Sequence, residues 1–159
     1  MATVAEKLQE IRTLLISSAA IDSFCQSSFG KNLTVFLGAD VRNLPEIDNY
    51  PYLLLDRGSS TFTDYQNSFA DVTSEFYIFI CIRDEQLEQP DGRGTIYRGV
   101  KQIDRLSQLV RQEICKAHPE IEFTKEDPVS MSETLPLREY PVYVSLLTGE
   151  IRHLREQLQ

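Results

Sequence analysis

The sequence predicts an α+β fold, with two helices packed on one face of a roughly four-stranded, mainly antiparallel sheet. Two stretches repeat apolar residues at helical spacing, and four short stretches are rich in β-branched and aromatic residues. They follow one another as helix, two strands, helix, two strands, and this grouping is typical of the α+β class. A chain of 159 residues, 42% of them hydrophobic, is expected to fold as a single domain over 1–159.

The first helix is expected over residues 4–18, with an extension towards Phe24 left open. Thr3 and Glu6 have the spacing of a capping box, in which each side chain accepts a hydrogen bond from a free backbone N–H. Gly30, with the serine-rich stretch before it, ends the helical pattern. The apolar stripe of this helix consists of Val4, Leu8, Ile11 and Leu15.

The first pair of strands is expected at residues 52–56 and 75–83, and residues 32–39 are a further candidate for a short strand. Pro51 suits the first or an edge position, because proline cannot donate to a strand ladder. Residues 75–83, EFYIFICIR, are apolar on both faces. This pattern predicts a central strand with a helix on at least one side.

The second half of the chain predicts a helix over residues 96–117, capped by Thr95. Strands at 121–125 and 140–148 follow, separated by a proline-containing loop at 126–137. Gly149 is expected to end the last strand, and a short tail with a helical turn or two follows it. The apolar stripe of this helix consists of Tyr97, Val100, Ile103, Leu106, Val110 and Ile114.

The segment at 57–74 is far longer than the two to five residues that usually join paired strands. It holds three aromatic residues among Ser, Thr, Asn and Gln, and only three charged residues. This composition is typical of contact surfaces, and we interpret the segment as an arm that leaves the sheet. The alternative is an Ω-loop whose aromatic residues cover the protein's own core. The candidate residues for contact with another subunit or a tube are Arg57, Phe62, Asp64, Tyr65 and Phe69.

The motifs favour neither an enzyme nor a bound cofactor or metal. Three cysteines without a CxxC pair and two histidines do not supply the close ligand set of a zinc site. The stretch DGRGTIYRG lacks the spacing of a dinucleotide or phosphate loop. Neighbouring acidic residues such as Asp84 and Glu85 are interpreted as solvated loop charges, and His118 as a structural residue at a helix C-terminus.

The charge balance argues against tight binding to nucleic acid. Sixteen basic and twenty-four acidic residues give a net charge of −8, whereas affinity for phosphate backbones requires a positive face. The N-terminal stretch carries charges where a signal peptide needs an apolar region, which predicts a cytoplasmic protein without a membrane partner. An exposed edge of the predicted sheet must be covered or used, and pairing with a neighbouring subunit is one way to use it.

The layout resembles the tail terminator (tail-completion) proteins of long-tailed bacteriophages and prophages, the lambda-like minor tail protein family. An N-terminal amphipathic helix precedes NLPEIDNYPYLLLDRGSS, a long segment leads to EFYIFICIRDE, and GVKQIDRLSQLVRQEI and YPVYVSLLTGEI follow. The resemblance spans nearly the whole chain. It lies in the order of segments rather than in a motif, so it assigns no role to any individual residue.

The resemblance implies a hexameric ring that caps the tail tube, stops its growth and helps to join tail and head. The implied partners are further copies of the chain, the tail tube protein and head–tail connector proteins, with duplex DNA passing through the channel unbound. The implied location is the host cytoplasm during assembly and then the tail or neck of the virion. Three alternatives remain: another neck or head–tail completion protein, a small-ligand enzyme domain on the same scaffold, and a nucleic-acid regulator, which the charge disfavours.

Overall fold

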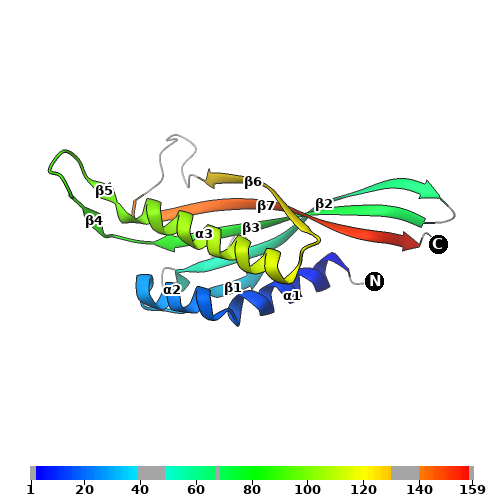
Figure 1. The fold of residues 1–159 in the computed structure, drawn as a ribbon, viewed down its shortest axis with the longest axis horizontal. Coiled ribbons are helices and arrows are strands. Elements are labelled where there is room, and N and C mark those ends of the chain that lie inside the picture. The colour runs from blue at the N-terminus through cyan, green and yellow to red at the C-terminus, as the bar shows by residue number, and fades with distance from the viewer. Residues whose placement is uncertain (1–2, 39–48, 67–68, 130–139, 158–159) are drawn as a thin grey trace.

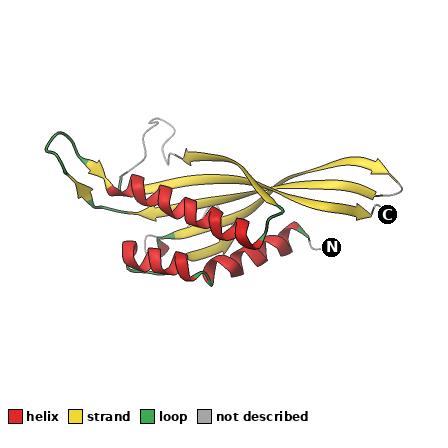
Figure 2. Ribbon diagram, viewed as in Figure 1, coloured by secondary structure: helices red, strands yellow, loops and turns green. Residues whose placement is uncertain are grey.

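One mixed sheet, covered on one face by helices, organises the protein (Figures 1 and 2). The structure is a computed structural model that describes residues 3–38, 49–66, 69–129 and 140–157; the side chains of 63–71 and 153–157 lie outside the description. Within these residues the strand order is β1-β2-β3-β7-β6, and a separate ribbon joins β4 and β5. The elements are α1 (Val4–Ile16), α2 (Ala19–Phe29), β1 (Thr34–Leu37), β2 (Tyr52–Gln66), β3 (Phe69–Arg83), β4 (Leu87–Glu88), β5 (Ile96–Tyr97), α3 (Arg98–Ala117), β6 (Ile121–Val129) and β7 (Val142–Gln157).

The α+β class is therefore confirmed, while the details of the sheet differ from the prediction. β1 lies parallel to β2, and all other neighbours in the five-stranded sheet are antiparallel. The candidate strand at 32–39 is confirmed as β1, which adds a fifth strand at the edge. The strand at 75–83 is central, as predicted, since β3 lies between β2 and β7.

The N-terminal region forms two helices rather than one. The capping box is confirmed: the Thr3 side chain accepts from the Glu6 N–H, and the Glu6 carboxylate accepts from the Thr3 N–H. The helix nevertheless ends at Ile16, because the Ser18 hydroxyl accepts from the Ile21 N–H and starts α2. α2 ends at Gly30, which adopts the left-handed conformation typical of a helix C-terminus. The described residues thus contain three helices, not the predicted two.

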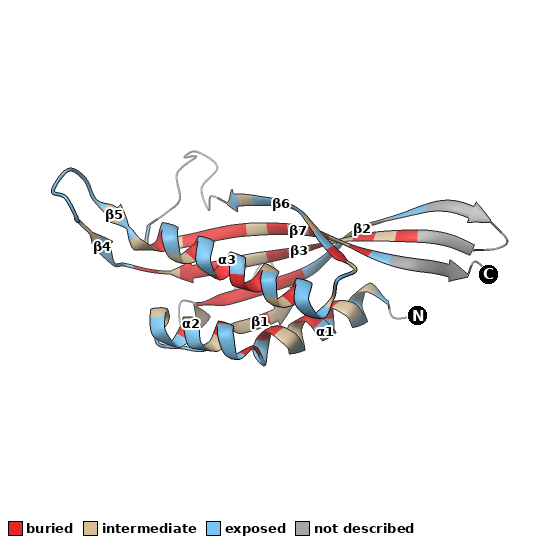
Figure 3. Ribbon diagram, in the orientation of Figure 1, coloured by how far each residue is buried: buried red, intermediate tan, exposed pale blue. Residues whose placement is uncertain are grey.

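The core lies between the helices and one face of the sheet. Alternate residues of β3, from Phe76 to Ile82, are fully buried against the apolar stripes of α1 and α3 (Figure 3). The opposite face of the sheet carries a smaller apolar cluster made of residues from the strands and their flanks. Its buried members are Tyr52, Leu54, Cys81 and Val144.

The segment at 57–74 is a β-hairpin and not a loop. β2 continues to Gln66 and β3 begins at Phe69, so almost the whole segment is strand, and residues 67–68 lie outside the description. A register shift between Arg57 and Ser60 marks a bulge at the base of the hairpin. Beyond it the Ser60 and Ser74 hydroxyls lie 2.8 Å apart and share a hydrogen bond across the two strands.

Gly149 lies inside the last strand and does not end it. β7 runs from Val142 to Gln157, so the predicted helical turn in the C-terminal tail is also wrong. A Cβ atom at Gly149 would lie 2.5 Å from Cζ of Phe76, the residue paired with it on β3. Glycine is required here because the Phe76 ring packs directly on the backbone.

Two other boundaries differ from the prediction. α3 begins at Arg98 after Tyr97, which makes no side-chain cap, so Thr95 is not the N-cap. The reason is that Ile96 and Tyr97 pair with β4 and form β5. β6 extends to Val129, which places the first residues of the predicted loop at 126–137 in a strand; residues 130–139 lie outside the description.

We expect Gly149→Ala to lower the free energy of unfolding by about 1–3 kcal/mol, because the added methyl group overlaps the Phe76 ring. Urea unfolding measures the change. Ser59→Ala, at an exposed position of β2, is the control and is expected to stay within about 0.5 kcal/mol of the unmodified chain. Equal stability of the Gly149→Ala variant and the unmodified chain would show that the contact with Phe76 does not determine this residue.

Candidate interaction surfaces

A three-stranded arm extends from the body past α1 and α3 (Figure 1). We define the arm as residues 58–66 of β2, 69–74 of β3 and 152–157 of β7, which pair in the order β2-β3-β7. β1 pairs with β2 only as far as Leu55, and β6 pairs with β7 only as far as Ile151. Within the described residues the arm is therefore a single sheet layer whose two outer strands have no strand beyond them.

The base of the arm is held by close packing of small residues. A Cβ atom at Gly58 would lie 2.9 Å from the Cβ of Glu75 and 3.0 Å from the Tyr77 ring, so the bulge brings the backbone directly against β3. Ser74, hydrogen bonded to Ser60, is fully buried. The next inward-facing residue, Val72, is 5% exposed. Buried residues at the base of the arm therefore fix how its strands leave the body.

Four of the five predicted contact residues lie on this arm, and Arg57 lies directly before it. Arg57 is exposed at its root, where its N–H donates to the Asp56 carboxylate. Phe62, paired with Val72, is 44% exposed, so its ring is not folded into the protein's own core. The backbones of Asp64, Tyr65 and Phe69 belong to the two strands near the hairpin turn, but their side chains lie outside the description. Their role in contacts stays a prediction.

A second exposed apolar surface lies at the other end of the molecule, around the β4–β5 ribbon (Figure 1). We call it the end patch and define it as Leu87, Tyr97 and Tyr140, which are 49%, 44% and 46% exposed. Leu87 and Tyr97 are paired across the ribbon, and the Tyr97 and Tyr140 rings meet edge to face at 5.3 Å between centroids. Three large apolar side chains so exposed and so close together are typical of a contact surface.

The sequence did not reveal the end patch. Helical spacing predicts that Tyr97 and Val100 belong to the apolar stripe of the helix at 96–117, but both are exposed. Two-residue strands are too short for a periodic signal. Tyr140 lies 43 positions further along the chain than Tyr97, and only the tertiary structure brings the two rings together.

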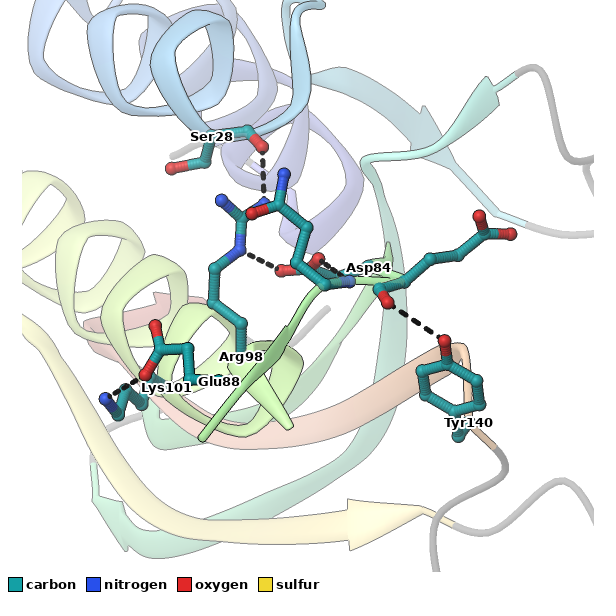
Figure 4. Close-up of polar contacts among 8 residues, drawn as sticks. Ser28, Asp84, Glu88, Arg98, Lys101 and Tyr140 are labelled. Atoms are coloured by element: carbon teal, nitrogen blue, oxygen red, sulfur yellow. Dashed lines mark hydrogen bonds and ion pairs between the residues drawn. The ribbon is translucent and has the colours of Figure 1, made fainter. Parts of the chain in front are cut away.

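An ion pair between the partly exposed Arg98 and the buried Asp84 lies beneath the end patch (Figure 4). The carboxylate of Asp84, at the end of β3, accepts from Arg98 Nε at 2.7 Å, and the Asp84 side chain is 1% exposed. A second Arg98 nitrogen donates to the Ser28 carbonyl of α2, at 2.9 Å. The Tyr140 hydroxyl donates to the Glu85 carbonyl at 2.9 Å. The interpretation of Asp84 as a solvated loop charge is therefore wrong: its burial is compensated by the guanidinium.

Two of the three thiols, those of Cys25 and Cys81, are buried. Burial raises the pKa of the Cys25 thiol to about 12 and, against a hydrogen bond from Tyr52, that of Cys81 to about 11. Both stay protonated near neutral pH, where a nucleophilic cysteine would be a thiolate. His118 follows α3 and lies 3.2 Å from the Glu120 carboxylate. No group of three metal-ligating side chains occurs among the residues that the structure covers.

Comparisons with known proteins add no relative. No protein-family model matches the chain, and no curated protein sequence matches it. Within the described part of the chain, no helix is both long and apolar enough to cross a membrane.

We expect Asp84→Asn to lower the free energy of unfolding by about 2–5 kcal/mol, because it leaves the Arg98 charge without its buried partner. The matched control is Glu88→Gln, which breaks the exposed pair with Lys101 and is expected to cost about 0–1 kcal/mol. Denaturant unfolding measures both. Similar losses for the two variants would contradict the structural role assigned to Asp84.

Reaction with an aromatic disulfide reagent at pH 8 is expected to modify one thiol rapidly in the native protein and all three in urea. The reactive thiol is Cys115, which is exposed, whereas Cys25 and Cys81 are buried and protonated. Absorbance of the released thiolate gives the count. Rapid modification of Cys115→Ser protein under native conditions would show that the buried thiols are accessible.

Proposed function

We propose that the chain is a structural subunit of a phage tail terminator. Copies of it assemble into a ring, a hexamer in our proposal, that caps the tail tube, stops its polymerisation and helps to join tail and head. The observation that carries the proposal is the placement of two different exposed surfaces at opposite ends of one elongated α+β subunit, the arm and the end patch (Figure 1). A ring requires such a pair, because each subunit contacts its two neighbours through different patches.

Charge supports the same proposal. The net charge of −8 disfavours retention of duplex DNA, so the nucleic acid would pass through a channel without being held. We assign the chain no catalytic role and no cofactor. The proposed partners are other copies, the tail tube protein and the head–tail connector proteins, in the host cytoplasm during assembly and in the tail or neck afterwards.

The main alternative is another neck or head–tail completion protein, which would also expose two surfaces. Assembly on isolated tail tubes separates the two functions, since only a terminator limits tube length. A small-ligand enzyme domain requires polar groups that converge on a pocket. Binding assays with a panel of small metabolites test this alternative, and a specific saturable ligand would favour it over a structural role.

The solution mass tests the proposal directly. The monomer has a mass of 18.2 kDa, and light scattering with purified protein, alone and with tail tubes, is expected to show a species of about six times that mass. The accompanying activity measurement is the length distribution of tubes assembled in its presence. A strictly monomeric protein that neither binds tubes nor limits their length would rule the function out.

Shortening the arm is expected to abolish assembly without unfolding the body. The paired residues Ser60 and Ser74 can be joined by an Asn-Gly turn, which suits a two-residue hairpin and removes the strands beyond them. Circular dichroism checks the fold, and light scattering checks assembly. Leu87→Ser with Tyr97→Ser is the companion variant at the end patch. If the short-armed protein assembles and caps tubes normally, the arm has no part in the function.

A further inference from the structure

The edges of the sheet differ in how well they are protected. An edge strand presents unpaired N–H and C=O groups that accept another strand, and proteins block such edges with charges, proline, bulges or covering groups. In the body the edge strands are β1 and β6. Among the described residues neither strand continues alongside the arm, where β2 and β7 are the outer strands.

Both edges of the body are blocked. Arg12 of α1 donates from Nε to the Val35 carbonyl of β1 at 2.8 Å, so a side chain already occupies an outward-facing acceptor. β6 contains Pro128, which has no N–H to donate, and a register shift between Phe123 and Lys125. It also carries four charged residues among nine, namely Glu122, Lys125, Glu126 and Asp127.

The β2 edge of the arm lacks these protections. After the bulge at its root, residues 60–63 read Ser-Thr-Phe-Thr, without charge or proline, and pair with β3 in unbroken register. Threonine and phenylalanine favour strands. Thr61 and Phe62 are exposed. A strand edge of this composition, outside the helical cover, is a site for an added strand.

The β7 edge of the arm carries charges, as β6 does, but they oppose the charge of the β2 edge. Residues 152–157 carry two arginines and one glutamate, net +1, whereas residues 58–66 carry only Asp64, net −1. The Arg152 side chain is 68% exposed, and its contact with Glu122 is 3.5 Å long. Opposite charge on facing strands favours their pairing.

We propose that the β2 edge of one arm pairs with the β7 edge of the arm of a second copy, so that neighbouring arms form a continuous sheet. This pairing uses both free edges of every copy. The choice of β7 as the partner of β2 rests on the proposed ring. If β2 paired with β2 of a second copy, β7 would stay open and assembly would end at two copies, whereas pairing of β2 with β7 continues from copy to copy. Main-chain hydrogen bonds supply the affinity, and the bulge and charges set the register.

Disulfide trapping tests the pairing. In a Cys115→Ser background, cysteine is placed singly at Ser60, Thr61 and Phe62 in one protein and at Arg152, His153 and Leu154 in another, with tags of different mass. Under mild oxidation we expect heterodimers between the β2 and β7 sets, at two or more positions in a consistent register, since directly opposed cysteines meet the distance for a disulfide. The matched control pairs the β2 set with Thr124→Cys on β6 and should give no heterodimer.

A charge introduced on the β2 edge tests the pairing independently, through its effect on assembly. Thr61→Lys is expected to raise the concentration for half-maximal assembly at least about 10-fold, since a lysine on an edge strand opposes strand addition. Thr61→Ala and Thr124→Lys, the latter on the blocked β6 edge, should leave it unchanged. Circular dichroism confirms that all three variants fold.

The outcomes separate this proposal from the function. A ring that forms without β2–β7 cross-links, or that tolerates Thr61→Lys, overturns the strand pairing and leaves the terminator proposal standing. Cross-links within the β2 set alone overturn the β2–β7 arrangement. β2–β7 cross-links in a protein that does not cap tubes support the pairing and remove the function. A monomer without cross-links, with or without tubes, overturns both.

Discussion

Three strands of the central sheet, β2, β3 and β7, are longer than the helices that cover them, and the rest of the structure depends on this mismatch. α3 has 20 residues and is about 30 Å long. β3 and β7 have 15 and 16 residues, or about 50 Å of strand. The core forms only where the helices lie over the sheet, so about 20 Å of sheet is left without cover as the arm (Figure 1).

Different interactions hold the two ends of the molecule in place. At the arm, order begins from buried small residues, with the Ser60–Ser74 hydrogen bond and the backbone of Gly58 against Tyr77. At the end patch the main interaction is an ion pair. The guanidinium of Arg98 binds Asp84, which follows β3, and the Ser28 carbonyl in the C-terminal turn of α2. An ion pair fixes orientation because an unpaired buried charge is costly, which suits a surface that must be presented in one geometry.

The proposed ring and the proposed strand pairing draw on the same property of the fold. A body whose edges are blocked by Arg12, Pro128 and charges avoids uncontrolled sheet-to-sheet association. An arm whose β2 edge is unblocked confines such association to one place. An acidic protein also repels its own copies at long range. Assembly therefore requires the specific short-range contacts that the arm and the end patch provide.

The sequence by itself determined the class, the central strand and the first helix start, because these follow from local patterns. A run that is apolar on both faces over 75–83 identified a central strand, and the spacing of Thr3 and Glu6 identified a helix N-terminus. It also singled out the segment that holds the arm, by its length and composition. Local pattern failed where partners lie far away. Gly149 predicts the end of a strand, but in the structure it lies within β7 because the Phe76 ring packs on its backbone. Asp84 predicts an exposed charge, but it is buried because Arg98 pairs with it.

Only the tertiary structure decided that the 57–74 segment is a hairpin and that an end patch exists. The strands of the arm are mostly polar, so their sequence lacks the apolar period from which a strand is predicted. The strands of the arm are defined by backbone hydrogen bonds between β2 and β3 and between β3 and β7. Many sequences of strand-forming residues can make such bonds. Likewise, Tyr97 and Tyr140 meet because α3 and β7 start at the same end of the sheet, and no short-range signal in the sequence encodes that meeting.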